Sequence, residues 1–378
     1  MKKLIISMPL LAAAVCTPAS AGLIGSAENF TVLSNTYTST GDSAVVYGNV
    51  IADTYATAGA NTIINGDFRT GDVLTLGDGA AVTGNAQSVE AGTATANTTV
   101  EGNFEVGGVG TMGDTSYVQG NFISGLDGTI GAKAVLDGNW EVGAGSVATA
   151  SLSSNKVAGD AVDTDTAYLN GVKSAITNDM NAATNDLIAA KVSLTAMGLG
   201  TGLAATMTVN TTYTAGVFSA ASWSTTAGTT LTLDGQGLDN QMWVFNIEDI
   251  LAFGGNSTVK LFDVGANAQV FWNVSNLTPG GYASLGDGAD IVGTIIAEDY
   301  VKVGANAFVR SASDGNCAGV YSTTSYVTIG ANAVVGGANC SVTTTTTTTV
   351  PEPETNILLL AGLGLMGFIK RRRCKKAA

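Results

Sequence analysis

The sequence of 378 residues predicts a mainly β chain: a β-solenoid with one long α-helix packed alongside, extended by a solenoid array of 18-residue repeats. Two observations predict it. A Gly-Asn or Gly-Asp pair returns every 18 residues, and an apolar stripe of helical period from Tyr168 to Met197 predicts a long helix in the segment 158–198. The composition agrees, because 45% hydrophobic and only 12% charged residues favour an ordered chain over a disordered one.

The repeat runs through about residues 52–157 and predicts one solenoid coil per 18 residues. A coil of that length has a perimeter of ~60 Å at ~3.3 Å per residue, which suits three short faces. We expect Gly and Asn to supply left-handed corners, and the Asn/Asp column to pass hydrogen bonds between coils. The Gly-Asn or Gly-Asp pairs begin at Gly48, Gly66, Gly84, Gly102, Gly120 and Gly138, and the large apolar residues two positions on, expected to stack inside, are Phe68, Phe104, Phe122 and Trp140.

The helical stripe predicts a helix that follows the array. Its apolar residues step by three or four positions from Tyr168 to Met197. Asp163 or Thr164 can cap its start, and Gly198 can end it. A helix of ~34 residues is ~50 Å long, enough to lie beside about ten coils stacked ~4.8 Å apart. A coiled coil is the alternative, but a stripe of Ala and Met with few charges suits docking on a sheet better.

Residues 1–21 have the pattern of a secretory signal peptide. Lys2 and Lys3 precede an apolar stretch, and Ala19-Ser20-Ala21 is a small-x-small cleavage site. We therefore expect the mature chain to begin at Gly22. Residues 343–350 are almost all Thr and predict a stalk between the folded part and the cell surface.

Residues 351–378 form a three-part segment. Pro351, Glu352 and Pro353 come first, the uncharged apolar run 357–369 follows, and a basic cluster ends the chain. This order resembles the PEP-CTERM sorting signal. The resemblance implies an exosortase-type processing enzyme as a partner, and a secreted or outer-surface location reached through transient anchoring by 357–369. A plain tail anchor is the alternative.

The cysteine count predicts a disulfide. Once both ends are removed only Cys317 and Cys340 remain, in an oxidising compartment, and a bond between them is the natural interpretation. Two free buried thiols are the alternative.

The chain has no His, which excludes Ser-His-Asp and Cys-His catalysis and His-ligated metal sites. We expect no enzyme activity, no catalytic residues, no metal and no cofactor. At Asp287–Asp290 a solvated turn is favoured over a calcium site. A formal net charge of −14 makes nucleic acid an unsuitable partner.

Segments outside the array resemble the ice-binding family often called DUF3494. The resemblance rests on Thr230–Gly237, Trp243–Ile247, Val270–Val274, Gly293–Ala297, the Gly-Ala-Asn-Ala corners at 265–268, 304–307 and 330–333, and the early segment 29–33. It implies a discontinuous β-solenoid with a long helix along it, with residues 22–51 as the first part and 199–342 as the second. The array departs from the usual family pattern, which has a short connection or a small cap there.

The family resemblance implies ice or an ordered water surface as the partner, and an antifreeze or recrystallisation-inhibiting function. A flat solenoid face of Thr and small residues would adsorb to the ice. One column of the repeat fits such a face: Thr57, Thr75, Thr93, Thr111 and Thr129. The same column is also explained by the preference of Thr for strands. A second class of function fits the sorting tail and the acidity: a structural or adhesion protein of the cell surface or biofilm matrix, without ice activity, with extracellular polysaccharide as its partner.

Overall fold

The computed structural model describes residues 22–150, 156–157, 162–163, 166–274, 280–312 and 318–337. The predicted signal peptide, stalk, Pro351-Glu352-Pro353 motif and apolar run 357–369 lie outside these residues, as do Cys317 and Cys340. The disulfide therefore stays a prediction. The chain divides into a unit of residues 1–342 and a unit of residues 343–378, and all described residues belong to the first.

Three parallel sheets form the walls of a solenoid, which confirms the predicted fold class. In spatial order, sheet A contains β22 (Val162–Asp163), β19 (Trp140–Val142), β16 (Phe122–Ser124), β13 (Phe104–Val106), β10 (Ala86–Ser88), β7 (Phe68–Thr70), β4 (Asn49–Ala52), β1 (Phe30–Ser34), β38 (Val320–Ser322), β35 (Thr294–Ala297), β32 (Gln269–Val274), β29 (Met242–Ile247), β26 (Gly216–Ala220) and β23 (Thr201–Gly202). Sheet B contains β20 (Ala148–Ala150), β17 (Gly128–Ile130), β14 (Gly110–Met112), β11 (Ala91–Ala94), β8 (Val73–Leu76), β5 (Tyr55–Ala58), β2 (Thr38–Thr40), β39 (Val327–Ile329), β36 (Val301–Val303), β33 (Tyr282–Leu285), β30 (Ile250–Phe253), β27 (Trp223–Thr225) and β24 (Thr206–Met207). Sheet C contains β21 (Lys156–Val157), β18 (Val135–Leu136), β15 (Tyr117–Val118), β12 (Thr99–Val100), β9 (Ala81–Val82), β6 (Ile63–Asn65), β3 (Val45–Tyr47), β40 (Val334–Val335), β37 (Phe308–Arg310), β34 (Asp290–Val292), β31 (Thr258–Phe262), β28 (Thr230–Asp234) and β25 (Thr211–Thr214).

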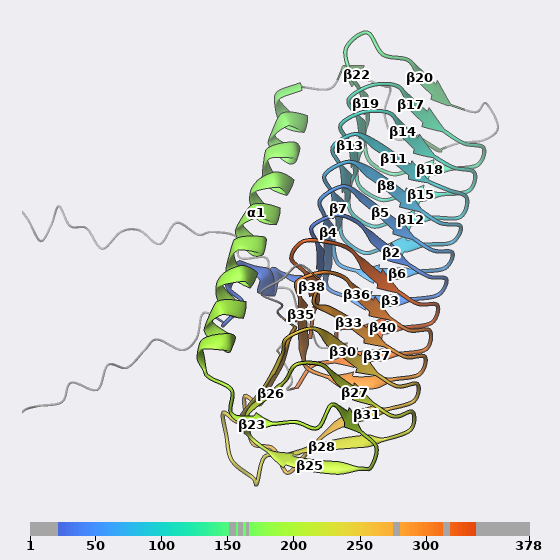
Figure 1. The fold of residues 1–378 in the computed structure, drawn as a ribbon. Helices are drawn as coiled ribbons and strands as arrows, with labels where there is room; N and C mark the ends of the chain where they lie inside the picture. The colour runs from blue at the N-terminus through green and yellow to red at the C-terminus, as the bar shows by residue number, and fades with distance from the viewer. Residues whose placement is uncertain are drawn as a thin grey trace, which may run out of the picture. The chain divides into compact units, whose positions relative to one another are not determined.

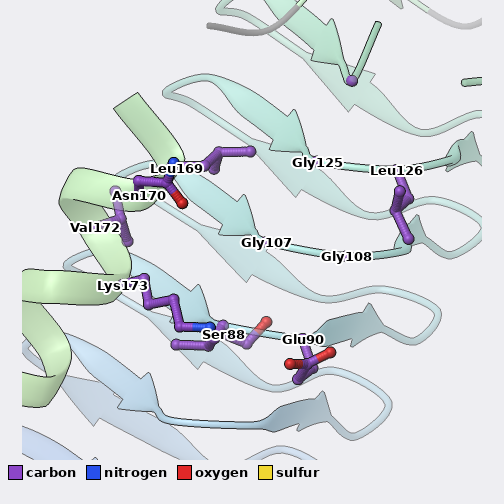
Figure 2. A pocket seen from close by; sticks show the side chains of 12 residues that line it. Ser88, Glu90, Gly107, Gly108, Gly125, Leu126, Leu169, Asn170, Val172 and Lys173 are labelled. Carbon is purple, nitrogen blue, oxygen red and sulfur yellow. The ribbon is translucent and has the colours of Figure 1, made fainter. Parts of the chain in front are cut away.

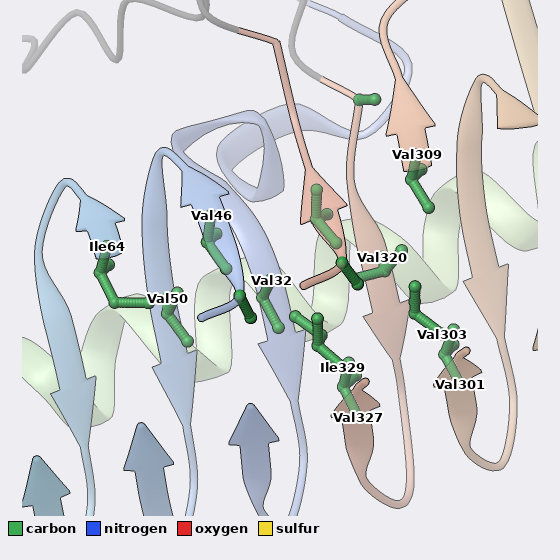
Figure 3. Close-up of a cluster of buried hydrophobic side chains, with 14 of the residues drawn as sticks. Val32, Val46, Val50, Ile64, Val301, Val303, Val309, Val320, Val327 and Ile329 are labelled. Atoms are coloured by element: carbon green, nitrogen blue, oxygen red, sulfur yellow. The ribbon is translucent and has the colours of Figure 1, made fainter. Parts of the chain in front are cut away.

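The chain builds this solenoid in two stretches that meet in its middle. The first stretch runs from β1, in the middle of the solenoid, to β22 at its upper end in Figure 1. The helix α1 (Thr166–Ala196) returns along sheet A to the lower end, and the second stretch runs from β23 there back to β40 in the middle. The last coil then pairs with the first: Val32 lies opposite Val320, and Val45 opposite Val334. We call this junction the seam. Buried aliphatic side chains fill the interior on both of its sides, as Figure 3 shows.

Large apolar side chains of the array stack inside the coils. Phe68, Phe104 and Phe122 are fully buried and Trp140 is 6% exposed, so the predicted inward direction is confirmed. The ring centroids of Phe104 and Phe122 lie 5.3 Å apart, and those of Phe122 and Trp140 lie 6.4 Å apart. Phe68 does not join this stack, because Ala86 occupies the coil between it and Phe104.

The expectation of left-handed backbone at the Gly-Asn and Gly-Asp corners is wrong for most of them. Gly48 has a positive φ, but the later glycines of that column and the Asn residues beside them do not. Gly is needed there for close approach instead, since a Cβ at Gly102 would lie 2.6 Å from the carbonyl oxygen of Gly84. The left-handed positions of the array lie at the other corner, between sheets B and C: Asn61, Gly79, Asn97, Thr115 and Lys133.

The Asn/Asp column forms the predicted ladder of hydrogen bonds between coils. The backbone N–H of Asp67 donates to Oδ1 of Asn49 at 2.8 Å, and that of Asn85 donates to Asp67 at 2.7 Å. The same contact of 2.9 Å repeats at Asn103, Asn121 and Asn139. Each side chain thus satisfies a backbone donor of the next coil, which fixes the register of the coils.

Helix α1 covers sheet A and bridges the seam. Its buried residues Ile176, Met180, Ala183, Leu187, Ala190 and Leu194 pack on side chains of β1 and β4 on one side and of β35 and β38 on the other. The ends of the predicted stripe differ, because Tyr168 and Met197 are 44% and 43% exposed. Gly198 ends the helix region with a φ of 93°, as predicted.

Three polar contacts hold α1 in this place. Asp186 accepts hydrogen bonds from the backbone N–H and the hydroxyl of Ser26, which hold the pKa of the carboxyl below its usual range. Lys191 is buried and pairs with Glu298 at 2.8 Å, and burial lowers the pKa of its ammonium group. Arg69 pairs with Asp179 at 2.7 Å.

We expect opposite effects from alanine at two glycines. Gly171 lies inside α1, and a Cβ added there would meet no atom within 4 Å apart from the neighbouring backbone of the helix itself, so Gly171→Ala should raise the free energy of unfolding by about 0.5–1 kcal/mol. Gly102→Ala should lower it by about 1–3 kcal/mol, because the added methyl meets the backbone of the preceding coil. Chemical denaturation of both variants measures this. Equal effects would contradict the close approach of the coils.

Candidate functional site: the outer face of sheet B

The three outer faces of the solenoid differ in cover and in charge. Helix α1 packs on sheet A, so that face is occupied along much of its length. Sheet C exposes charged side chains, among them Lys260, Arg310 and Asp290, the last two paired at 2.6 Å. Sheet B presents a row of small hydroxyl side chains, which makes it the candidate surface for a large, flat, uncharged partner.

The structure brings the five predicted Thr residues into one column on sheet B. Thr57, Thr75, Thr93, Thr111 and Thr129 lie directly opposite one another on adjacent parallel strands. In each strand the residues on both sides of the Thr are buried and the Thr itself is exposed or half-exposed. The strand alternation therefore turns every Thr of the column outward.

The column is longer than the sequence predicted. Thr149 continues it above Thr129, while Ser39 and then Thr328 continue it below Thr57. Eight consecutive strands thus carry an outward hydroxyl group, over roughly 34 Å at the strand spacing of a sheet. Thr149 was missed because two extra residues shift it out of the 18-residue register, and Thr328 because only the seam brings it next to Ser39.

Small residues border the column on the side toward sheet C. The position two residues after the column is Gly in most strands, including Gly59, Gly77 and Gly113. A Cβ at Gly59 would lie 2.6 Å from the backbone of Gly41, so the tight stacking of the coils keeps this border free of side chains. Thr95 is an exception, and its hydroxyl donates to the carbonyl of Leu76 at 2.9 Å.

A row of stacked tyrosines borders the lower end of the hydroxyl column, and continues below it, on the side toward sheet A. Tyr282, Tyr300, Tyr326, Tyr37 and Tyr55 follow one another with ring centroids 4.6–5.1 Å apart. The contact between Tyr326 and Tyr37 crosses the seam. Burial, together with the neighbouring Tyr282, raises the pKa of Tyr300 to about 12. Farther up the array the border becomes Val73, Ala91 and Val109, which project less than a tyrosine ring.

Below Thr328 the outward positions in line with the column no longer all carry a hydroxyl group. The next position is the exposed Lys302, followed by Ser284, Ala252, Ser224 and Thr206. Of the 13 column positions that the described strands supply, Lys302 is the charged one. The uninterrupted hydroxyl column is therefore the part above Lys302, made by the array and the two coils at the seam.

The Thr-Ala-x-Thr segments 95–98 and 226–229 lie at the corners between sheets B and C. The hydroxyl of Thr98 donates to the carbonyl of Thr95 at 3.0 Å, and that of Thr229 to the carbonyl of Thr226 at 2.7 Å. Thr98 and Thr229 are buried. The second Thr of each segment therefore closes a turn and is absent from the outer face.

A groove of about 260 Å³ separates the first turns of α1 from the array (Figure 2). Gly107, Gly108 and Gly125 form one wall, and Leu169 and Lys173 of the helix form the other. The hydroxyl of Tyr168 donates to Glu105 at 2.5 Å beside it. The helix thus packs closely from Ile176 onward, and the groove lies beside its first turns.

Within the described ranges, the structure shows no group of three or more acidic, Cys or His side chains that could hold a metal ion. Asp287, from the segment weighed for calcium, accepts a hydrogen bond from the backbone of Ala305 and so holds a coil corner. Among the same residues, no helix is long and apolar enough to cross a membrane.

The fold and this face define a class: a solenoid that offers an extended outer surface lined with hydroxyl groups. A family profile described as Ice-binding-like matches residues 126–335. That is more than half of the chain, so the chain belongs to the ice-binding-like family, and the resemblance inferred from the sequence is confirmed. The family is structural rather than catalytic, and the chain is not an enzyme. A second profile, the PEP-CTERM protein-sorting motif, matches residues 349–373.

Solved structures of ice-binding proteins are similar to the chain. The DUF3494 domain of Shewanella frigidimarina ice-binding protein 1 has 20% identity and a TM-score of 0.45, with 82% of this chain and 95% of that chain covered. An ice-binding protein of the Antarctic ascomycete Antarctomyces psychrotrophicus has 16% identity and a TM-score of 0.41, with 82% and 96% covered. No curated protein matches the sequence.

Proposed function

We propose that the chain is an exported ice-binding protein that adsorbs to ice through the outer face of sheet B. Membership of the ice-binding-like family supports ice as the partner. The observation that carries the proposed face is the column of eight consecutive hydroxyl residues, with Thr57, Thr75, Thr93, Thr111 and Thr129 at its centre.

The physical basis is a regular surface that orders water without holding it as tightly as charges do. Each Thr offers a methyl group, which water cannot bond, beside a hydroxyl group, which accepts and donates hydrogen bonds. Ordered waters bridging such groups cost little free energy and can merge with a growing lattice. Seven of the eight strands that carry the column are paired on both sides, so the spacing of their hydroxyl groups is fixed before ice arrives.

Growth of single ice crystals in a solution of the exported protein tests the proposal. We expect faceted crystals and slower recrystallisation, because adsorbed protein blocks growth of the planes to which it binds. Round crystals and unchanged recrystallisation at every protein concentration would reject ice binding. That outcome would favour the second class of function, a structural protein of the cell surface or matrix that contacts polysaccharide.

We further propose that both ends are removed during export. The signal-peptide pattern of residues 1–21 and the PEP-CTERM match at 349–373 support this. Intact-mass measurement of the exported protein is expected to show Gly22 as the first residue and the loss of the basic cluster that contains Arg371–Arg373. The unprocessed protein from the cell interior serves as the reference. Exported protein that keeps Arg371–Arg373 would overturn processing by an exosortase-type enzyme.

A further inference from the structure

The lower end of the solenoid, formed by β23, β24 and β25, is an open edge. Each of these strands is the last of its sheet in the described part of the chain, so one side of its backbone has no strand partner there. Natural proteins protect such edges with charged residues, with proline or with a covering element. Neither of the first two is present, because the sequence has no charged residue between Lys191 and Asp234 and no proline there.

This end also exposes apolar side chains and contains a hollow. Leu199 is 73% exposed and Val209 is 68% exposed. The hollow has a volume of about 610 Å³ and is lined in part by Tyr213 and Phe218, whose ring centroids are 4.8 Å apart. Helix α1 stops above the coil of β23, β24 and β25 and does not cover this edge (Figure 1). The exposed Leu199 and Val209 at an unprotected edge indicate a contact surface.

We propose that this end binds the same end of a second copy of the chain and forms a two-fold dimer. The charge distribution favours this end as the contact between two copies. A chain of net charge −14 repels its copies over most of its surface, whereas residues 192–233 carry no charge and allow two copies to approach. The unpaired backbone N–H and C=O groups of an edge strand can form hydrogen bonds with those of another edge strand. A two-fold axis allows both copies to use the same surface for this contact.

The arrangement of the three sheets fixes the pairing. A two-fold axis perpendicular to sheet B places β24 antiparallel to β24 of the second copy, and β23 beside the other copy's β25. Sheet B then continues from one copy into the next, while Val209 and the hollow are covered. The contact is closed, because each copy uses its only lower end, and growth stops at two.

Sedimentation velocity of the exported protein over a hundredfold range of concentration tests the dimer. We expect one concentration-dependent step from monomer to dimer. Thr206 is exposed and lies next to its own copy at the axis, so Thr206→Glu sets two like charges against each other and should raise the dissociation constant roughly tenfold or more. Val209→Asp should act in the same direction.

Ser284→Glu is the matched control, since Ser284 occupies the same outward column three strands from the edge. It should leave the dimer unchanged, and thermal melts should be the same for all these variants because the replaced side chains are not buried. A wild-type protein that stays monomeric would overturn the proposal. So would an open series of larger assemblies, or a dimer that is indifferent to both Thr206→Glu and Val209→Asp.

Discussion

Replacement of Phe104 by alanine is expected to lower the free energy of unfolding by about 3–5 kcal/mol. The ring is fully buried and stacks on Phe122, and a Cβ at Gly92 would lie 3.1 Å from it. Ala86 occupies the same position one coil below and cannot fill the space left behind. Because each coil contacts only its neighbours, a cavity there weakens the join between the coils below and above it. Denaturant unfolding measures the change.

Val109→Ala is the control for Phe104→Ala. Val109 lies on the outer face near β14 and is 44% exposed, so its truncation should change the free energy of unfolding by less than about 0.5 kcal/mol. Equal losses in the two variants would mean that the ring stack does not stabilise the array.

Replacement of Thr93 by lysine is expected to abolish or strongly weaken ice shaping while the melting temperature stays nearly unchanged. Thr93 is exposed at the centre of the hydroxyl column, so the longer side chain stands above the flat face without entering the core. A charged group there holds its own hydration shell and separates the face from a flat crystal surface. Ice-crystal microscopy and thermal unfolding measure the two effects.

Thr99→Lys is the matched control, because Thr99 lies on the same coil but faces outward from sheet C. It should leave ice shaping intact. If Thr93→Lys shapes ice like the wild type, the hydroxyl column is not the binding face. Loss of shaping on substitution within Thr230–Leu233 would then assign the activity to the second stretch of the solenoid.

The regular half of the molecule could be predicted from the sequence because its period is fixed. Six Gly-Asn or Gly-Asp pairs 18 residues apart determine which residues are opposite, so the Thr column and the inward rings follow directly. The roles of the glycines do not follow. A glycine needed for a positive φ, such as Gly79, and one needed for close approach, such as Gly102, look the same in a sequence.

The irregular half and the seam could not be predicted to the same depth. The Gly-Ala-Asn-Ala corners predicted coils, and Asn267, Asn306 and Asn332 do take left-handed backbone conformations there. Their unequal spacing hides the strand registers, however. The tyrosine row needs the pairing of β39 with β2, which joins residues almost 300 positions apart. No local pattern carries that information.

The seam also determines how the molecule must fold. Chains fold from the N-terminus as they are made, so the array can form its coils first, from contacts only 18 residues apart. The lower edge of β1, β2 and β3 then stays unpaired until the last coil has formed. The strands of that coil end at Val335. Contacts of such long sequence separation form slowly. The final step of folding therefore takes place in the middle of the solenoid, and until then the array presents three open strand edges to any other chain nearby.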